Sequence, residues 1–298
     1  MKHPRLARVA PVVIALVIIM SLIGGEFLTA SAQTDGLPQA LQRARAAGSY
    51  QFTADIEQQL HPRPVTAMIG QSSQQLTWHL EGNVQGRDHS RLEISLASGM
   101  DGRRAATLIQ DGAKTFLLRG DSLEEVSNPF SLGTPTTDYL AFVGAADNVR
   151  LLDAVQASGE TFTRYQFDIN GPQMALDMLN EMQRQLQGQM PARMRLQPPQ
   201  NLQRMTGSGE IWIDSQGLPR RQVMDLHMPE VDARYDAQTH LVIDFFRFGA
   251  TSLVPDVVPG PDGGWQLQPL APAAPRDAAI TAPGLHLAAV WAGVRPVV

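Results

Sequence analysis

Residues that could do acid, base or metal chemistry are scattered along this chain without a recognisable spacing. Cysteine is absent, which excludes thiolate catalysis and thiolate metal ligands. The histidines follow neither the H-x-x-x-H nor the H-E-x-x-H spacing that sets two ligands on one face of a helix. Those beyond the N-terminal segment are His61, His79, His89, His227, His240 and His286. The sequence therefore predicts no metal site and no cofactor.

Nucleophilic catalysis has no better support in the sequence. Ser208 lies in Gly207-Ser208-Gly209, which lacks the G-x-S-x-G frame of a nucleophile elbow and precedes a strand rather than a helix. Asp225 and His227 share one face of a predicted strand, a spacing that is typical of a solvated surface. We assign no catalytic residue and expect a protein that is not an enzyme. The alternative is a hydrolase whose site has no recognisable motif.

Methionines are the one compositional indication of a binding function. Met174, Met178, Met182, Met190 and Met194 lie in or just beyond one segment. Their thioether side chains are flexible, so they adapt to ligands of variable shape. The alternative is that they are ordinary core residues of a helix packed on a sheet.

Most of the elements that position these residues are strands. Residues Leu37 to Ala47 carry apolar side chains at helical spacing and end before Gly48, which predicts an amphipathic helix. Apolar and polar residues then alternate over 50–56 and 76–84, as in half-buried antiparallel strands. Further strands are predicted at 91–96, 104–110, 114–118, 161–169, 209–214, 221–228 and 240–248. Turn residues at Asp111-Gly112 and over 215–219 predict hairpins.

Two segments break the strand pattern. Residues 136–146 predict a short helix, and a longer one runs from Gly171 to near Gly188. Together the elements predict an α+β fold, a strongly curved antiparallel sheet (an incomplete β-barrel) with helices covering its open side. After Leu253 prolines interrupt every element, which is typical of a mobile extension. We expect one domain over 33–254 and a Pro-rich tail, disordered in the simplest interpretation, over 255–298.

Residues 1–32 have the layout of a secretory signal. A basic start precedes an apolar block from Val9 to Gly25, and small residues at Ala30 and Ala32 predict cleavage before Gln33. The alternative is an uncleaved anchor, because the block is close to the roughly 20 residues that span a bilayer. We therefore expect an exported protein that is periplasmic, extracellular or associated with the cell envelope. The formal net charge of −5 gives no basic surface for nucleic acid.

Several short motifs resemble those of a known family. They are Gly82-Asn83-Val84-Gln85-Gly86, the strand end from Tyr165 to Gly171, and above all Gly209-Glu210-Ile211-Trp212-Ile213-Asp214 with Gly217-Leu218-Pro219-Arg220-Arg221. From about Gln39 to Leu253 the chain resembles the LppX/LprG-like branch of the LolA/LolB-like lipoprotein-carrier superfamily. The resemblance implies an incomplete barrel around an apolar cavity that holds acyl chains. Many members of the branch are anchored by a lipidated cysteine, which this chain lacks.

The resemblance also implies where lipid would bind. The expected lipid-binding residues are Phe52, Ile56, Leu76, Trp78, Leu80, Tyr139, Phe142, Met174, Met178, Met182 and Trp212. The expected function is that of a non-enzymatic carrier, whose partner is a lipid or an acylated lipoprotein at a membrane surface. The alternative is an envelope sensor or protein-interaction module on the same scaffold, with a filled core and an exposed apolar patch.

Overall fold

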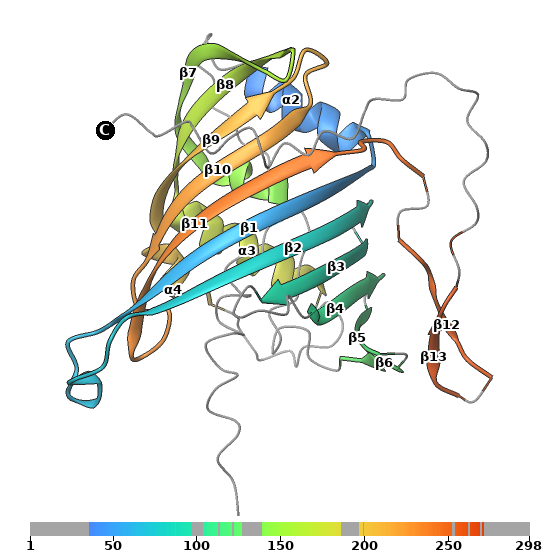
Figure 1. The fold of residues 1–298 in the computed structure, drawn as a ribbon, viewed down its shortest axis with the longest axis horizontal. Coiled ribbons are helices and arrows are strands. Elements are labelled where there is room, and N and C mark those ends of the chain that lie inside the picture. The colour runs from blue at the N-terminus through green and yellow to red at the C-terminus, as the bar shows by residue number, and fades with distance from the viewer. Residues whose placement is uncertain are drawn as a thin grey trace, which may run out of the picture.

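One antiparallel sheet organises the computed structural model of this chain (Figure 1). The structure describes residues 36–270 apart from 87, 97–103, 113, 121, 127–138, 186–196, 199, 252–253, 262 and 269. In that part of the chain thirteen strands lie in the order β12-β13-β6-β5-β4-β3-β2-β1-β11-β10-β9-β8-β7. Their bounds are β1 (Ser49–Pro62), β2 (Gln74–Gln85), β3 (His89–Leu96), β4 (Arg104–Asp111), β5 (Lys114–Arg119), β6 (Ser122–Glu125), β7 (Ala146–Ala157), β8 (Glu160–Ile169), β9 (Thr206–Ile213), β10 (Pro219–Met228), β11 (Tyr235–Phe246), β12 (Val257–Pro259) and β13 (Trp265–Leu267).

Alternation along the strands gives the sheet one buried and one exposed face. In β1, Phe52 and Ile56 are buried, while Asp55 and Glu57 are exposed. The antiparallel register carries this alternation to the neighbouring strands, because directly opposed residues point to the same face. We call the side that carries Phe52 and Ile56 the inner face and the side that carries Asp55 and Glu57 the outer face.

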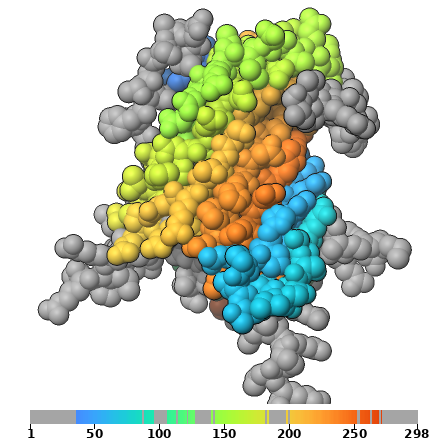
Figure 2. Space-filling model, turned by 90° about the vertical axis from the view of Figure 1, so that its left-hand side faces the viewer, coloured from blue at the N-terminus to red at the C-terminus, as the bar shows by residue number. Residues whose placement is uncertain are grey.

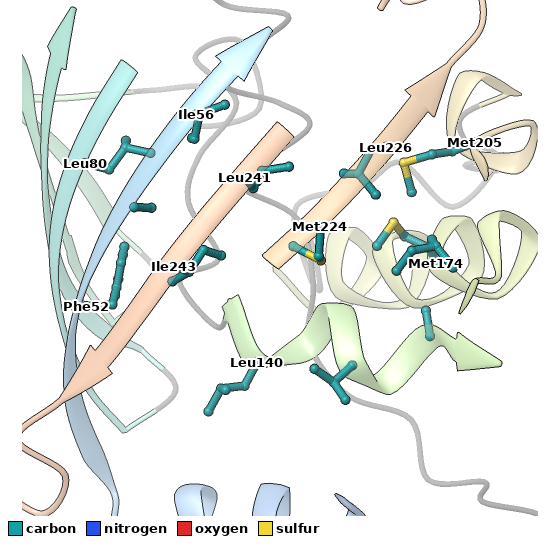
Figure 3. Packing of buried hydrophobic residues seen from close by; sticks show 14 of the residues in the cluster. Phe52, Ile56, Leu80, Leu140, Met174, Met205, Met224, Leu226, Leu241 and Ile243 are labelled. Atoms are coloured by element: carbon teal, nitrogen blue, oxygen red, sulfur yellow. The ribbon is translucent and has the colours of Figure 1, made fainter. Parts of the chain in front are cut away.

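Helices cover the inner face. They are α2 (Gly36–Ala46), the 3₁₀ turns η2 (Thr66–Met68) and η4 (Tyr139–Ala145), α3 (Gly171–Gln185) and α4 (Gln200–Gln203). The helix α3 starts at an N-cap, where the Asn170 side-chain oxygen accepts a hydrogen bond from the Gln173 backbone N–H at 3.0 Å. Met174 and Met178 of α3 belong to the same core cluster as the inner side chains of β1. Figure 3 shows Met174 on the side of α3 that faces the strands.

The hairpin between β9 and β10 depends on the carboxylate of Asp214. This carboxylate accepts hydrogen bonds from the backbone N–H groups of Gln216 and Leu218 at 2.9 and 2.8 Å, and from Arg220 Nε at 2.6 Å. Gly217 completes the turn with φ of 76°, a conformation that L side chains rarely adopt. The longest of the family-like motifs therefore encodes a turn.

The predicted fold class is confirmed. The strand order ends at β12 and at β7, so the described sheet is open, and its helices pack on one face. The two hairpins and the helices near residues 37 and 171 are also confirmed. The short helix expected over 136–146 is a 3₁₀ helix at Tyr139–Ala145, and its earlier residues lie outside the described part, as does the signal segment.

Four strands are absent from the sequence prediction. β7 is an edge strand with almost no burial, and its pairing with β8 is interrupted by two register shifts, so it has no clean alternation. β6, β12 and β13 have three or four residues each, which is too short for a periodic signal. β12 and β13 belong to the segment that was expected to be a mobile tail.

A small second core joins this segment to the sheet. Ile109, Phe116 and Leu123 form it together with Trp265, whose ring meets that of Phe116 at 5.2 Å between centroids. The Asp111 carboxylate also accepts a hydrogen bond from the backbone N–H of Val257, at 2.9 Å. No helix within the described ranges has the length and hydropathy needed to cross a membrane.

Candidate functional site

The inner face of the sheet is the largest apolar surface of the described chain. Across the central strands one row of opposed residues runs from Trp78 in β2 through Ile56 in β1 and Leu241 in β11 to Met224 in β10. All four side chains are buried in one cluster. Figure 3 shows Ile56, Leu241 and Met224 of this row. This layer between sheet and helices is the candidate site.

Methionines gather where the helices meet β10. Met174 and Met178 come from α3, Met205 follows α4, and Met224 and Met228 come from β10. All five are buried, and Figure 3 shows the side chains of Met174, Met205 and Met224 in the space between α3, α4 and the strand. Thioether side chains have several rotamers of similar energy, so this methionine seam can change shape more easily than one of branched residues.

Three polar side chains of the inner face keep an atom without a hydrogen-bond partner. They are Gln58 (Oε1), Trp78 (Nε1) and Gln222 (Oε1), whose residues are 1%, 2% and 0% exposed. The nitrogen of the Gln58 amide donates to Thr239 Oγ1 at 3.2 Å, and that of Gln222 contacts Met224 Sδ at 3.0 Å. A buried polar group without a partner costs about 1–3 kcal/mol, so each marks a position where a further group could bind favourably.

One carboxyl group also lies in this layer. Asp177 of α3 is 4% exposed, and its carboxylate accepts a hydrogen bond from Gln173 Nε2 at 2.9 Å. Burial raises the pKa of Asp177, and the bond from Gln173 lowers it by less. Within the described residues its hydrogen-bond partner is this amide, which supplies no base, nucleophile or cation for acid–base chemistry.

The structure brings together most of the residues expected to bind lipid. Six are buried in the cluster between sheet and helices: Phe52, Ile56, Trp78, Leu80, Met174 and Met178. Leu76 is half-buried and packs against the same cluster. The burial of Tyr139, Phe142 and Met182 lies outside what the structure describes, although their backbones belong to η4 and α3.

Trp212 does not join this set. Its neighbour Ile211 lies opposite Gln222 on the inner face, whereas Trp212 lies opposite Arg221 and Arg164 on the outer face. The ring is half-buried, with the Arg164 guanidinium 5.6 Å from its centroid, and its indole N–H donates to Glu210. The expectation that Trp212 lines the interior is corrected: a difference of one residue along a strand moves a side chain to the other face.

The outer face carries the residues that the sequence offered for catalysis. Here β1, β9, β10 and β11 form an open hollow of about 550 Å³, lined by Ser208, Asp225, His227 and His240 among others. Figure 2 shows these strands as diagonal bands across one face of the molecule. His240 Nδ1 lies 2.7 Å from Asp225 Oδ1, but Ser208 pairs with Asp225 in the register, so the carboxylate separates the hydroxyl from the imidazole.

This arrangement does not form a nucleophilic triad. A triad needs the histidine between the serine and the carboxylate, so that the imidazole can take the hydroxyl proton. In the described ranges no group of three or more histidine and acidic side chains is placed to hold a metal ion. The outer hollow is thus a polar, solvated surface.

Three polar residues of the inner face were not predicted from the sequence: Gln58, Thr239 and Gln222. The sequence did contain a signal for Gln58. This residue continues the alternation of Phe52 and Ile56 by one further step, and that alternation predicts a buried side chain. Gln222 lies two residues before Met224, in the same alternation. A polar residue at a position where the alternation of a strand predicts an apolar one is therefore the sequence signal for such buried polar groups.

No family model matches the chain, and no curated protein matches it by sequence. Solved structures with a similar fold do exist. The structure of LprF from Mycobacterium bovis is similar at a TM-score of 0.42 and 12% identity, over 76% of this chain and 99% of that one. Lipoprotein LppX from Mycobacterium tuberculosis is similar at 0.40 and 12%, over 74% and 96%.

A third similar structure is the MucA/MucB complex of Pseudomonas aeruginosa, at a TM-score of 0.31 and 12% identity, over 73% of this chain and 59% of that one. LppX gives its name to the branch that the sequence motifs resemble. All three TM-scores lie below 0.5 at 12% identity.

Proposed function

We propose that this chain is an exported, non-enzymatic carrier that holds the acyl chains of a lipid or an acylated lipoprotein between the inner face and its helices. The methionine seam is the observation that carries the proposal. Five buried methionines line the junction of α3, α4 and β10. Adaptable side chains at that junction suit a ligand of variable length and shape.

The energetics of an acyl ligand fit an apolar layer of this kind. Burial of hydrocarbon contributes about 0.8 kcal/mol per methylene, so a long acyl chain supplies roughly 10 kcal/mol without any polar recognition. Such a carrier requires no catalytic residue and no cofactor. Its cargo passes from and to a membrane surface, in agreement with the signal-like residues 1–32.

The proposal keeps the domain division expected from the sequence. Residues 1–32 act as a signal or an anchor, 33–254 form the lipid-binding domain, and 255–298 form a Pro-rich extension. The described part of this extension contributes β12 and β13, which pair with each other, and β13 also pairs with β6. Its first residues are thus an added edge of the sheet.

The first experiment is native mass spectrometry, with lipid extraction, of the full chain expressed with its own leader. A lipid that copurifies in near-stoichiometric amount supports the carrier and identifies its cargo class. A mass without ligand, combined with no uptake of added lipid from vesicles, contradicts it. That result would favour the envelope sensor or protein-interaction module.

Two substitutions in α3 locate the bound lipid. Met178 is buried against the sheet, whereas Leu176 on the same helix is 47% exposed. We expect Met178→Lys to reduce the copurifying lipid roughly tenfold or more and Leu176→Lys to leave it unchanged, since only the first brings a charge into the apolar layer. Circular dichroism and thermal unfolding are measured on both. A loss of folding by Met178→Lys that equals its loss of lipid would favour a plain core role for this methionine.

A further inference from the structure

Two of the residues with an unpaired polar atom are neighbours on the inner face. Gln58 of β1 is opposite Leu76 of β2, and Trp78 of β2 is opposite Ile56 of β1. Gln58 and Trp78 are therefore diagonal neighbours on adjacent strands, a separation of about 7–8 Å that long side chains can reach across. Thr239 lies opposite Gln58 on the other side, in β11, and holds its amide nitrogen.

The two atoms have complementary chemistry. The indole N–H of Trp78 can only donate a hydrogen bond, and the amide oxygen of Gln58 can only accept one. The Thr239 hydroxyl accepts from the amide nitrogen of Gln58, which leaves the amide oxygen as the atom without a partner. Neither residue has contact with bulk water, because they are 1% and 2% exposed.

The described neighbours of this pair on the inner face of the sheet are uncharged. The cross-strand neighbours on the same face are Ile56 and Leu76 beside the pair, and Leu226 beyond Thr239. A charged group placed here would lose its hydration without gaining a counter-ion, which costs far more than one or two hydrogen bonds return. A neutral group that both accepts and donates a hydrogen bond meets both needs.

We infer that Gln58 and Trp78 form a polar subsite inside the apolar layer, which binds a hydroxyl or amide group carried on the acyl chain of the ligand. The inference rests on the proposed carrier function and specifies its cargo. The group accepts from Trp78 Nε1 and donates to Gln58 Oε1, so the subsite selects chains with such a group over plain hydrocarbon chains.

Gln222 has a different environment and provides the control. It lies on β10, opposite Ile243 and Ile211, and its amide nitrogen already contacts Met224 Sδ. Both directly opposed side chains are aliphatic, so they offer its free oxygen no donor. Gln222 is buried as deeply as Gln58. A Gln→Leu substitution therefore removes one buried amide group at either position.

The test compares two probes that carry a hydroxyl group with one that carries none. Methyl ricinoleate has a hydroxyl in the middle of its chain, oleyl alcohol has one at its end, and methyl oleate has none. Affinities are measured on the full chain, after delipidation, by competition for a bound fluorescent fatty acyl probe. We expect at least one hydroxyl probe to bind roughly tenfold more tightly than methyl oleate, the effect of two modest hydrogen bonds.

Two variants remove the subsite without leaving a further buried polar atom unpaired. Gln58→Leu with Thr239→Val replaces both partners of a buried bond by apolar groups of similar shape, which leaves stability nearly unchanged. Trp78→Phe removes the indole donor alone. Each is expected to abolish the preference for the hydroxyl probe and to keep the affinity for methyl oleate, whereas Gln222→Leu keeps the preference. Thermal unfolding verifies that all variants fold.

The outcomes separate this inference from the proposed function. Equal affinity of the three probes for the unchanged protein overturns the subsite and leaves the carrier standing. A preference that survives both subsite variants, or that is lost equally in Gln222→Leu, overturns it as well. Failure of every probe to bind contradicts the carrier itself and the subsite with it.

Discussion

The centre of the inner face and the Arg164–Glu210 pair of the outer face differ in how their polar groups are paired, although His61 Nε2 and Arg91 Nε of the outer face also lack a partner. On the outer face Arg164 and Glu210 share two hydrogen bonds, of 2.6 and 3.0 Å, across neighbouring strands. On the inner face Gln58, Trp78 and Gln222 each keep a polar atom without a partner. Water could hydrogen-bond to Arg164 and Glu210, yet these two side chains are paired with each other. Water does not reach the unpaired atoms of Gln58, Trp78 and Gln222.

This difference indicates where a ligand gains most. A polar atom on the outer face can exchange its protein partner for water at little cost, so a bound molecule adds little there. An unpaired atom on the inner face has lost its hydration already, and any partner improves its energy. The apolar layer with its few polar atoms has the composition of a binding site, and the outer face has that of a solvated surface.

The largest effect is expected from a charge placed on the inner face. Ile56→Asp puts a carboxylate at a position that is fully buried and opposite Trp78 and Leu241, so it should lower the free energy of unfolding by about 3–5 kcal/mol. Its neighbour Glu57 lies on the outer face, and Glu57→Gln should change stability by no more than about 0.5 kcal/mol. Urea denaturation measures both. Similar losses in the two variants would contradict the assignment of the faces.

The second effect concerns the glycines that make room for aromatic rings. Gly82 lies opposite Phe52, and a β-carbon at Gly82 would collide with that ring. We expect Gly82→Ala to destabilise the fold by about 1–3 kcal/mol, because the core around Phe52 must shift. A β-carbon at Gly144 of η4 would meet nothing within 4 Å, and the φ of Gly144 is not positive, so Gly144→Ala should cause no loss of stability. Equal costs of the two alanines in urea denaturation would contradict the packing argument.

Much of the fold could be predicted from local pattern. Alternation over 50–56 and 76–84 identified β1 and β2, since both strands have one buried and one solvated face. β7 could not be found in this way, because an edge strand without a buried face has no pattern to show. Residues 257–267 were assigned to a mobile tail, because the contact of Trp265 with Phe116 is made across a distance in sequence that local pattern does not reveal.

The candidate site could be predicted only where the sequence indicated the correct face of the sheet for each strand residue. Phe52, Ile56 and Leu80 follow their strands' alternation and reach the core as expected. Trp212 is offset by one residue from Ile211, and an aromatic side chain in a strand gives no information about its face unless the register is known. Gln58 was overlooked because a polar residue is read as the end of a strand, when here it continues the inner face.

The third prediction concerns the pH dependence of stability through Asp177. Burial raises the pKa of this carboxyl, so the folded protein binds the proton more tightly than the unfolded chain, whose value is 3.8. Its contribution to stability is complete below that value and is lost as the pH rises through the folded pKa. Asp177→Asn should therefore stabilise the protein at pH 7 and have little effect below pH 3.8. Urea denaturation at both pH values measures it, and a destabilised variant at pH 7 would indicate that the carboxylate has a charged partner in the folded state.

The smallest effect belongs to the outer face, at the Arg164–Glu210 pair. Both side chains are 26% exposed, so water screens their attraction even though the geometry is bidentate. A double-mutant cycle with Arg164→Met and Glu210→Gln should give a coupling energy of about 0.5–1 kcal/mol, which decreases in high salt. The measured quantity is the free energy of unfolding of the four proteins. A coupling energy above about 2 kcal/mol would mean that the Arg164–Glu210 pair on the outer face is also shielded from solvent. The two faces would then differ in the charge of their polar groups rather than in their access to water.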